Sequence, residues 1–279
     1  MALDFYSYIS GQYLENVTIL FESFSFESKS FWTLFISGQW NPGAGTWYEM
    51  FSKLYILHLM VMSGTQVGAL DTVVRKAFWF VVPYRYHLRV HPVEKYIRSF
   101  FLLNFVIVSG VSPPILRGAL VTGLRVAMPR LIPSYALVAA LLIQTLFFSS
   151  HLMSLGFYLS WLAFLILFIS RELKLKSYLL SVVVSSVIFV LVEVFVFDNA
   201  LSFQMLMLCV LANVIFCDFF EYALVPLAGW MIFVSIVSAY LLFFCHILGP
   251  IGKFLALWGD PLVKLLLVAI KKLMYTNLL

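Results

Sequence analysis

Long apolar stretches, separated by short polar or basic segments, follow one another along most of the sequence. A helix needs about 20 apolar residues to cross the hydrocarbon core of a bilayer. We expect spans or half-spans at 49–82, 97–110, 115–128, 131–149, 152–169, 177–197, 201–219, 222–248 and 254–273. The pattern predicts an all-α polytopic integral membrane protein with roughly seven to ten transmembrane or half-membrane helices, some of them broken or re-entrant.

The N-terminal region has a different pattern. Apolar positions recur at near-helical spacing over residues 3–24 but alternate with acidic residues, which favours a helix at the membrane interface. A short apolar run then leads into a loop rich in Gly at 37–45. We therefore divide the chain into 1–45, an amphipathic or interfacial helix and loop, and 46–279, a membrane domain.

The first long apolar block is broken in the middle by Ser63 and Gly64, and it also contains His58, Gln66 and Asp71. Irregular backbone at membrane depth persists only where protein or a water-filled cavity surrounds it. We therefore expect this break to lie beside a polar cavity.

Two later breaks follow the same logic. The segment 110–114 (GVSPP) separates two helices of about 21 Å each, too short to span alone. They form either a re-entrant hairpin or one broken crossing. Residues 259–261 (GDP) are expected to interrupt the last span.

Composition and charge restrict the class and the orientation. Hydrophobic residues make up 63% of the chain and charged residues 11%, whereas soluble domains carry about 25% charged residues, so a soluble globular protein is excluded. Basic residues gather at 85–98, 125–130, 171–176 and 271–272. When the spans alternate, all four clusters fall on one side, which predicts a cytoplasmic loop at 83–98 and a cytoplasmic C-terminus.

Polar side chains inside the spans are the candidates for function, because each is costly in a membrane. Beyond the first block they are Asn104, Arg117, Gln144, Glu193, Gln204, Asn213 and Asp218. The chain has no HExxH, GxSxG or Walker motif. We therefore expect no enzyme activity, no catalytic residue, no cofactor and no metal site.

Arg117 and Asn213 each allow two interpretations. Arg117 follows two prolines near the start of a short helix, where a guanidinium suits a phosphate but also suits lipid headgroups at the interface. Asn213 either forms a hydrogen bond between helices or lines a path.

Four segments, in order, resemble the ComEC competence-protein family over about residues 35–275. Residues 58–68 (HLMVMSGTQVG) resemble the family's HLLAISGLHVG signature, and 109–119 (SGVSPPILRGA) resemble its TGxxPPxxRA segment. Residues 156–163 (GFYLSWLA) resemble GFQLSFLA. Residues 211–213 (LAN), followed by Pro226 and Gly229, resemble a fourth stretch.

The matched family positions are His58, Ser63, Gly64, Gly68, Arg117, Gly156, Ser160 and Asn213. Gln66 departs from the pattern because the family has a histidine there, and Glu193 and Asp218 stand where prolines are common. The family's OB-like and metallo-β-lactamase-like domains have no counterpart in this sequence. We therefore expect no intrinsic nuclease.

The resemblance implies a multi-pass channel of the bacterial inner membrane that takes up single-stranded DNA during natural transformation. The expected channel or substrate path comprises His58, Ser63, Gly64, Gln66, Asp71, Arg117 and Asn213. Gly68, Gly156 and Ser160 are expected as structural motif residues. The expected partners are single-stranded DNA, the lipid bilayer and separate cytoplasmic motor and DNA-receptor proteins, with homo-oligomerisation left open. The alternatives are a non-DNA transporter or permease on the same scaffold, or a membrane-embedded enzyme acting on a lipid.

Overall fold

The computed structural model describes residues 2–37, 43–53, 64–83, 87–154, 203–240 and 245–275, together with short pieces between 157 and 191. The helices are α1 (Ala2–Leu20), α2 (Phe26–Ser37), α3 (Ala44–Lys53), α5 (Gly64–Val81), α6 (His87–Val108), α7 (Pro113–Ala127), α8 (Pro133–Phe147), the 3-10 helix η2 (Ser149–Met153), α11 (Phe203–Phe219), the π-helical η3 (Phe220–Leu224), α12 (Val225–Tyr240) and α13 (Cys245–Tyr275). The described residues contain no strand, which confirms the all-α fold class.

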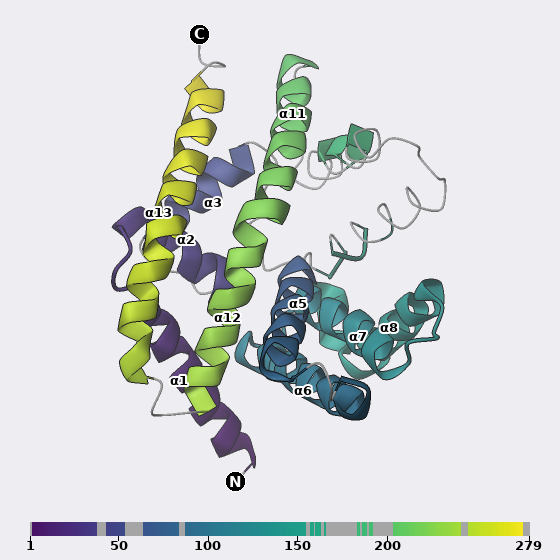
Figure 1. The fold of residues 1–279 in the computed structure, drawn as a ribbon. Helices are drawn as coiled ribbons and strands as arrows, with labels where there is room; N and C mark the ends of the chain where they lie inside the picture. The colour runs from purple at the N-terminus through teal and green to yellow at the C-terminus, as the bar shows by residue number, and fades with distance from the viewer. Residues whose placement is uncertain are drawn as a thin grey trace.

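The helices form two groups on either side of one long rod (Figure 1). The rod is α11 and α12; α1, α2, α3 and α13 lie on one side of it, and α5 to α8 lie on the other. The helix α12 packs against both α5 and α1, and within the second group α5, α6 and α7 contact one another. The rod therefore joins the two groups.

Aromatic rings fill the contact between the rod and the N-terminal helices. Phe31 and Phe35 of α2 stack on each other, with ring centroids 5.5 Å apart. Phe220 of η3 packs edge-on against Phe35 at 5.6 Å and against Phe51 of α3 at 5.9 Å. All four rings are buried. The segment before residue 45 thus shares its core with later helices, and the division at 45/46 stays a prediction.

We expected two separate spans at 201–219 and 222–248, and this is wrong because the rod is continuous. The chain runs through their junction as one helix and does not turn back. The Val225 N–H bonds to the Phe220 carbonyl, the wider π-type spacing. Proline has no N–H and its ring crowds the carbonyl four residues earlier, so a π turn just before Pro226 relieves that crowding without ending the helix.

Among the described residues, Cys209–Tyr240 is the stretch long and apolar enough to cross a membrane, by length and composition alone. We placed the basic clusters on one side of the membrane by assuming that successive spans alternate in direction. Because the rod is one continuous helix, the chain has one change of direction fewer than we assumed. The cytoplasmic C-terminus stays a prediction, which now depends on Lys271 and Lys272 rather than on the number of spans.

The basic segment at 83–98 was expected to be a loop, and that is wrong for most of its length. The helix α6 begins at His87 and contains Pro92. Because Pro92 lies close to the helix N-terminus, it removes only the hydrogen bond to the Leu88 carbonyl. The helix is therefore about 33 Å long rather than a short half-span.

The break at 110–114 is confirmed. Gly110 and Val111 both adopt positive φ, +71° and +57°, and the Val111 N–H bonds to the Val106 carbonyl at 2.9 Å. Pro113 begins α7, where its missing N–H has no helical partner to lose. Since α6 and α7 also contact each other, the pair is a helical hairpin.

The expected interruption at 259–261 is wrong, because α13 continues through these residues. Gly259 lies against α2 and the turn before it: a Cβ there would be 2.6 Å from Cε1 of Phe24, in that turn, and 3.1 Å from Nε1 of Trp32, in α2. The Asp260 carboxylate accepts hydrogen bonds from the Ser25 backbone N–H at 3.1 Å and from its hydroxyl at 3.3 Å. The residues mark a close helix contact and not a break.

Candidate functional site

Arg117 lies at the centre of a contact between three segments that are distant in sequence. It is on the first turns of α7 and only 8% of its surface is exposed. Its Nε donates a hydrogen bond to the Ser160 hydroxyl oxygen at 2.7 Å, and Ser160 is itself buried. The guanidinium is therefore held within the protein and does not extend from its surface.

The third segment is the start of α5. A Cβ on Gly64 would lie 2.9 Å from Nη2 of Arg117, and a Cβ on Gly118 would lie 2.8 Å from the Cα of Gly64. A side chain on Gly118 would require the backbone to move, whereas a side chain on Gly64 would displace the Arg117 guanidinium. The glycines therefore let α5 and α7 approach closely enough for Arg117 to lie against Gly64.

An aromatic and an amide side chain complete this cluster. The centroid of the Trp161 ring is 5.9 Å from Cζ of Arg117, within cation–π range. The Trp161 indole N–H donates to Oε1 of Gln144 at 3.0 Å, and Nε2 of Gln144 donates to the Pro113 carbonyl at 3.0 Å. We call Gly64, Arg117, Gly118, Gln144, Ser160 and Trp161 the Arg117 cluster.

Four members of the Arg117 cluster, Gly118, Gln144, Ser160 and Trp161, were not among the residues predicted for the path, and only Ser160 of these was expected as a structural motif residue. The sequence did mark Gln144 as a candidate, because it is a polar residue inside an apolar span. The sequence did not show which residues it would contact. Trp161 follows Ser160 directly, but its packing against Arg117 depends on the fold. Gln144 is fully buried in α8, so its paired amide prevents an unsatisfied polar group there.

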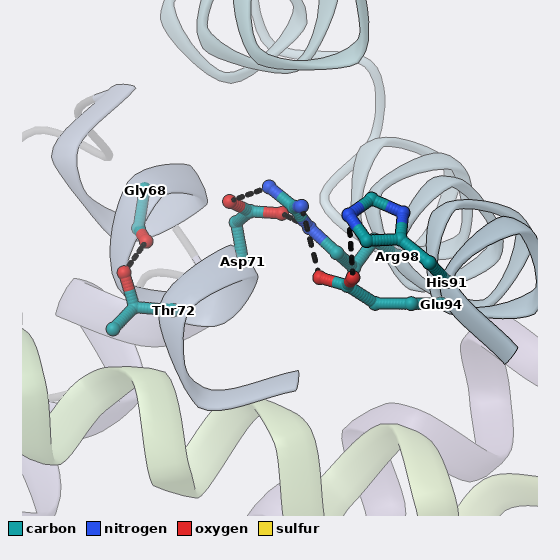
Figure 2. Close-up of polar contacts among 6 residues, drawn as sticks. All are labelled: Gly68, Asp71, Thr72, His91, Glu94 and Arg98. Carbon is teal, nitrogen blue, oxygen red and sulfur yellow. Dashed lines mark hydrogen bonds and ion pairs between the residues drawn. The ribbon is translucent and has the colours of Figure 1, made fainter. Parts of the chain in front are cut away.

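Asp71 lies two turns further along α5 and belongs to a different contact. Figure 2 shows Arg98 of α6 between the Asp71 and Glu94 carboxylates. Arg98 Nε is 2.6 Å from Oδ1 of Asp71 and Nη2 is 2.7 Å from Oδ2, a two-pronged ion pair. Arg98 Nη1 donates to Glu94 Oε1 at 3.2 Å, and His91 Nε2 lies 4.0 Å from Glu94 Oε2.

These three charged groups have little exposure. The Arg98 side chain is 16% exposed, that of Asp71 14% and that of Glu94 3%. We expected Arg98 to be a basic residue of the loop at 83–98. It is instead an ion-paired residue that links α6 to α5. Asp71 is not brought to Arg117 by any contact in the described part of the chain.

Gln66 and Asn213 are buried at two further places. Gln66 Nε2 donates to the Phe35 carbonyl at 2.6 Å, near the end of α2, where the last carbonyls lack helical partners. Asn213 Nδ2 donates to the Cys209 carbonyl at 3.1 Å, one turn earlier in its own helix. Gly68 is exposed, and its carbonyl accepts the Thr72 hydroxyl at 2.9 Å (Figure 2).

Three of the predicted residues, His58, Ser63 and Gly156, lie outside the described residues. The expected polar cavity beside the break at 63–64 stays a prediction for that reason. Within the described part of the chain, no group of three His, Cys, Asp or Glu side chains is placed to hold a metal ion.

Comparison with protein families shows that a competence protein model matches residues 43–276. No match was found among curated proteins or among solved structures. The matched range contains all three segments that meet at Arg117 and confirms the resemblance to the ComEC family. The chain therefore belongs to the competence protein family.

Proposed function

We propose that this protein is a multi-pass channel of the bacterial inner membrane that conducts single-stranded DNA into the cytoplasm during natural transformation. The family membership supports a role in competence. The apolar stretch Cys209–Tyr240 and the low content of charged residues support an integral membrane location.

The observation that carries this proposal is the contact of Arg117 with Ser160 and Gly64. The three residues come from three separate segments that resemble family motifs, so the family pattern converges on one guanidinium. A guanidinium matches a phosphate better than an ammonium does, because its donors form a planar fork. A nearby indole ring offers a surface on which a base can stack.

Burial of the Arg117 cluster suits a narrow point of the path better than an open vestibule. Conduction needs contacts that are strong enough to admit the strand and weak enough to release it. We propose that a strand displaces part of this packing as it passes, with the driving force supplied by a separate cytoplasmic motor. We propose no nuclease activity for the chain itself.

The test compares Arg117→Ala with Arg117→Lys in the natural host, with transformation frequency and membrane abundance measured together. A hydrogen bond to a charged group contributes about 1.5–3 kcal/mol, so loss of the guanidinium should lower uptake by roughly tenfold to a hundredfold. Arg117→Lys should recover only part of it. Arg125→Ala is the matched control, because Arg125 is an exposed arginine on the same helix.

Normal uptake in Arg117→Ala at normal abundance would remove Arg117 from the path. A deletion strain with unchanged transformation would remove the DNA role altogether and leave a permease or a lipid enzyme as the function. Full recovery by lysine, with abundance and uptake falling in parallel in Arg117→Ala, would indicate a purely structural arginine.

A further inference from the structure

A groove of about 440 Å³ runs between α5 and α12. Its lining is Lys76, Ala77, Phe80 and Val81 from α5 with Trp230 and Phe233 from α12. Its volume falls in the range of small-molecule sites. The groove belongs to a different part of α5 from the one that contacts Arg117.

The groove exists because α5 and α12 touch closely at one point. A Cβ on Gly229 would lie 3.0 Å from the backbone carbon of Ala69, so the two backbones are in direct contact there. Straight helices that cross at one point diverge on either side of it. Beyond this crossing, the space between them is bordered by Lys76 and Phe80 on α5 and by Trp230 and Phe233 on α12.

The exposed side chains of this groove are unusually apolar. Phe80 is 92% exposed, Val81 77% and Trp230 44%. A face of this kind favours contact with an apolar partner over contact with water. In the proposed membrane setting that partner is a hydrocarbon chain.

Lys76 indicates that a molecule bound in the groove carries negative charge. It is the charged residue in the lining, it is exposed, and it forms no ion pair within the described residues. The nearest carboxylate on its own helix, Asp71, is already held by Arg98. Arg75 is exposed beside it. An occupant with an apolar body and an anionic head complements this arrangement, since each such base near a surface attracts anionic lipid by about 1 kcal/mol.

We propose that the groove between α5 and α12 binds one anionic phospholipid of the surrounding bilayer. An acyl chain lies against Phe80, Trp230 and Phe233, and the Lys76 ammonium binds the phosphate. The proposal depends on the membrane location and is independent of DNA transport, so it can fail or succeed whatever the transported molecule is.

The test uses the purified full chain in detergent and two lipids with identical acyl chains, phosphatidylglycerol and phosphatidylcholine. Phosphatidylglycerol with brominated chains should quench tryptophan fluorescence several-fold more effectively than brominated phosphatidylcholine at equal concentration. The chain has seven tryptophans, so Trp230→Phe isolates the groove, and the extra quenching should disappear in that variant. Lys76→Gln should weaken phosphatidylglycerol binding to the level of phosphatidylcholine, about a fivefold loss if the ammonium supplies about 1 kcal/mol.

Lys264→Gln is the matched control, because Lys264 is an exposed lysine on α13, away from the groove. It should leave the preference unchanged. Equal quenching by the two lipids in the unmodified protein would overturn the proposal, as would a preference that survives both Lys76→Gln and Trp230→Phe. The circular dichroism spectrum of each variant confirms that a negative result does not come from unfolding.

Discussion

Gly118 of α7 meets Gly64 of α5 backbone to backbone: a Cβ on Gly118 would lie 2.8 Å from the Cα of Gly64 and 3.2 Å from its carbonyl oxygen. Gly118 follows Arg117 directly, so the approach of the two helices also sets the position of the guanidinium. Close helix approach at small residues is a common way for membrane helices to associate.

We expect Gly118→Ala to force α7 away from α5. Overpacking of this kind costs about 1–3 kcal/mol, and it should lower both the melting temperature of the purified protein and its transformation frequency. Gly123→Ala is the control on the same helix, because nothing lies within 4 Å of a Cβ at that position. Equal behaviour of the two variants would show that the close crossing does not matter.

The ion pair between Asp71 and Arg98 should stabilise the packing of α6 on α5. Removing one partner leaves the other charged side chain largely shielded from water and without its ion-pair partner. In a fully buried site, this loss typically lowers the free energy of unfolding by about 3–5 kcal/mol. Asp71→Asn and Arg98→Gln should each lower thermal stability. The double variant should lose less than the sum of the two, with a coupling energy of about 0.5–3 kcal/mol.

The pair Glu49 and Lys53 provides the contrast for that experiment. Its N–O distance is also 2.6 Å, but its side chains are 67% and 54% exposed. Lys53→Gln should leave the melting temperature unchanged within error, because exposed pairs are screened by water and salt. A coupling energy near zero for Asp71 and Arg98 would contradict our view of the partly buried pair.

Asp260 should hold the start of α2 through Ser25. Asp260→Ala removes the acceptor of the two hydrogen bonds that Ser25 donates to this carboxylate, and a hydrogen bond to a charged group contributes about 1.5–3 kcal/mol. Hydrogen–deuterium exchange should then speed up in the first turn of α2 and stay unchanged in α7. Asp260→Asn keeps one carbonyl acceptor and should show a smaller increase; unchanged exchange in Asp260→Ala would contradict the assignment.

The orientation of the chain can be tested with reporter fusions. We expect a cytoplasmic signal from a fusion at residue 84 and from one after residue 279, because basic clusters flank both places. A fusion near residue 110, in the turn between α6 and α7, should report the opposite side if that hairpin crosses the membrane. A periplasmic signal at either of the first two positions would reject the predicted orientation.

Much of the candidate site was predictable as a set of residues, but not as an arrangement. Gly64, Arg117 and Ser160 were singled out by motif resemblance, and the fold brings them together. Asp71 and Gln66 were expected in the same path because they are polar and close in sequence to Gly64. Asp71 is instead paired with Arg98, 27 residues away, and Gln66 is hydrogen-bonded to the Phe35 carbonyl, 31 residues away.

The sequence by itself determined the features that depend on local chemistry. The apolar runs made the chain helical, and the Gly110–Pro114 segment turned it, because positive φ and a proline at a helix start are preferences of the residues themselves. Only the tertiary structure decided whether Gly259 and Asp260 end a helix or pack one, and whether the chain turns or continues at Phe220–Leu224. Glycine, aspartate and proline have the same local preferences in both cases. The outcome depends on a neighbour that is distant in sequence: α2 beside Gly259 and Asp260, and, for the π turn, the packing of Phe220 against Phe35 and Phe51.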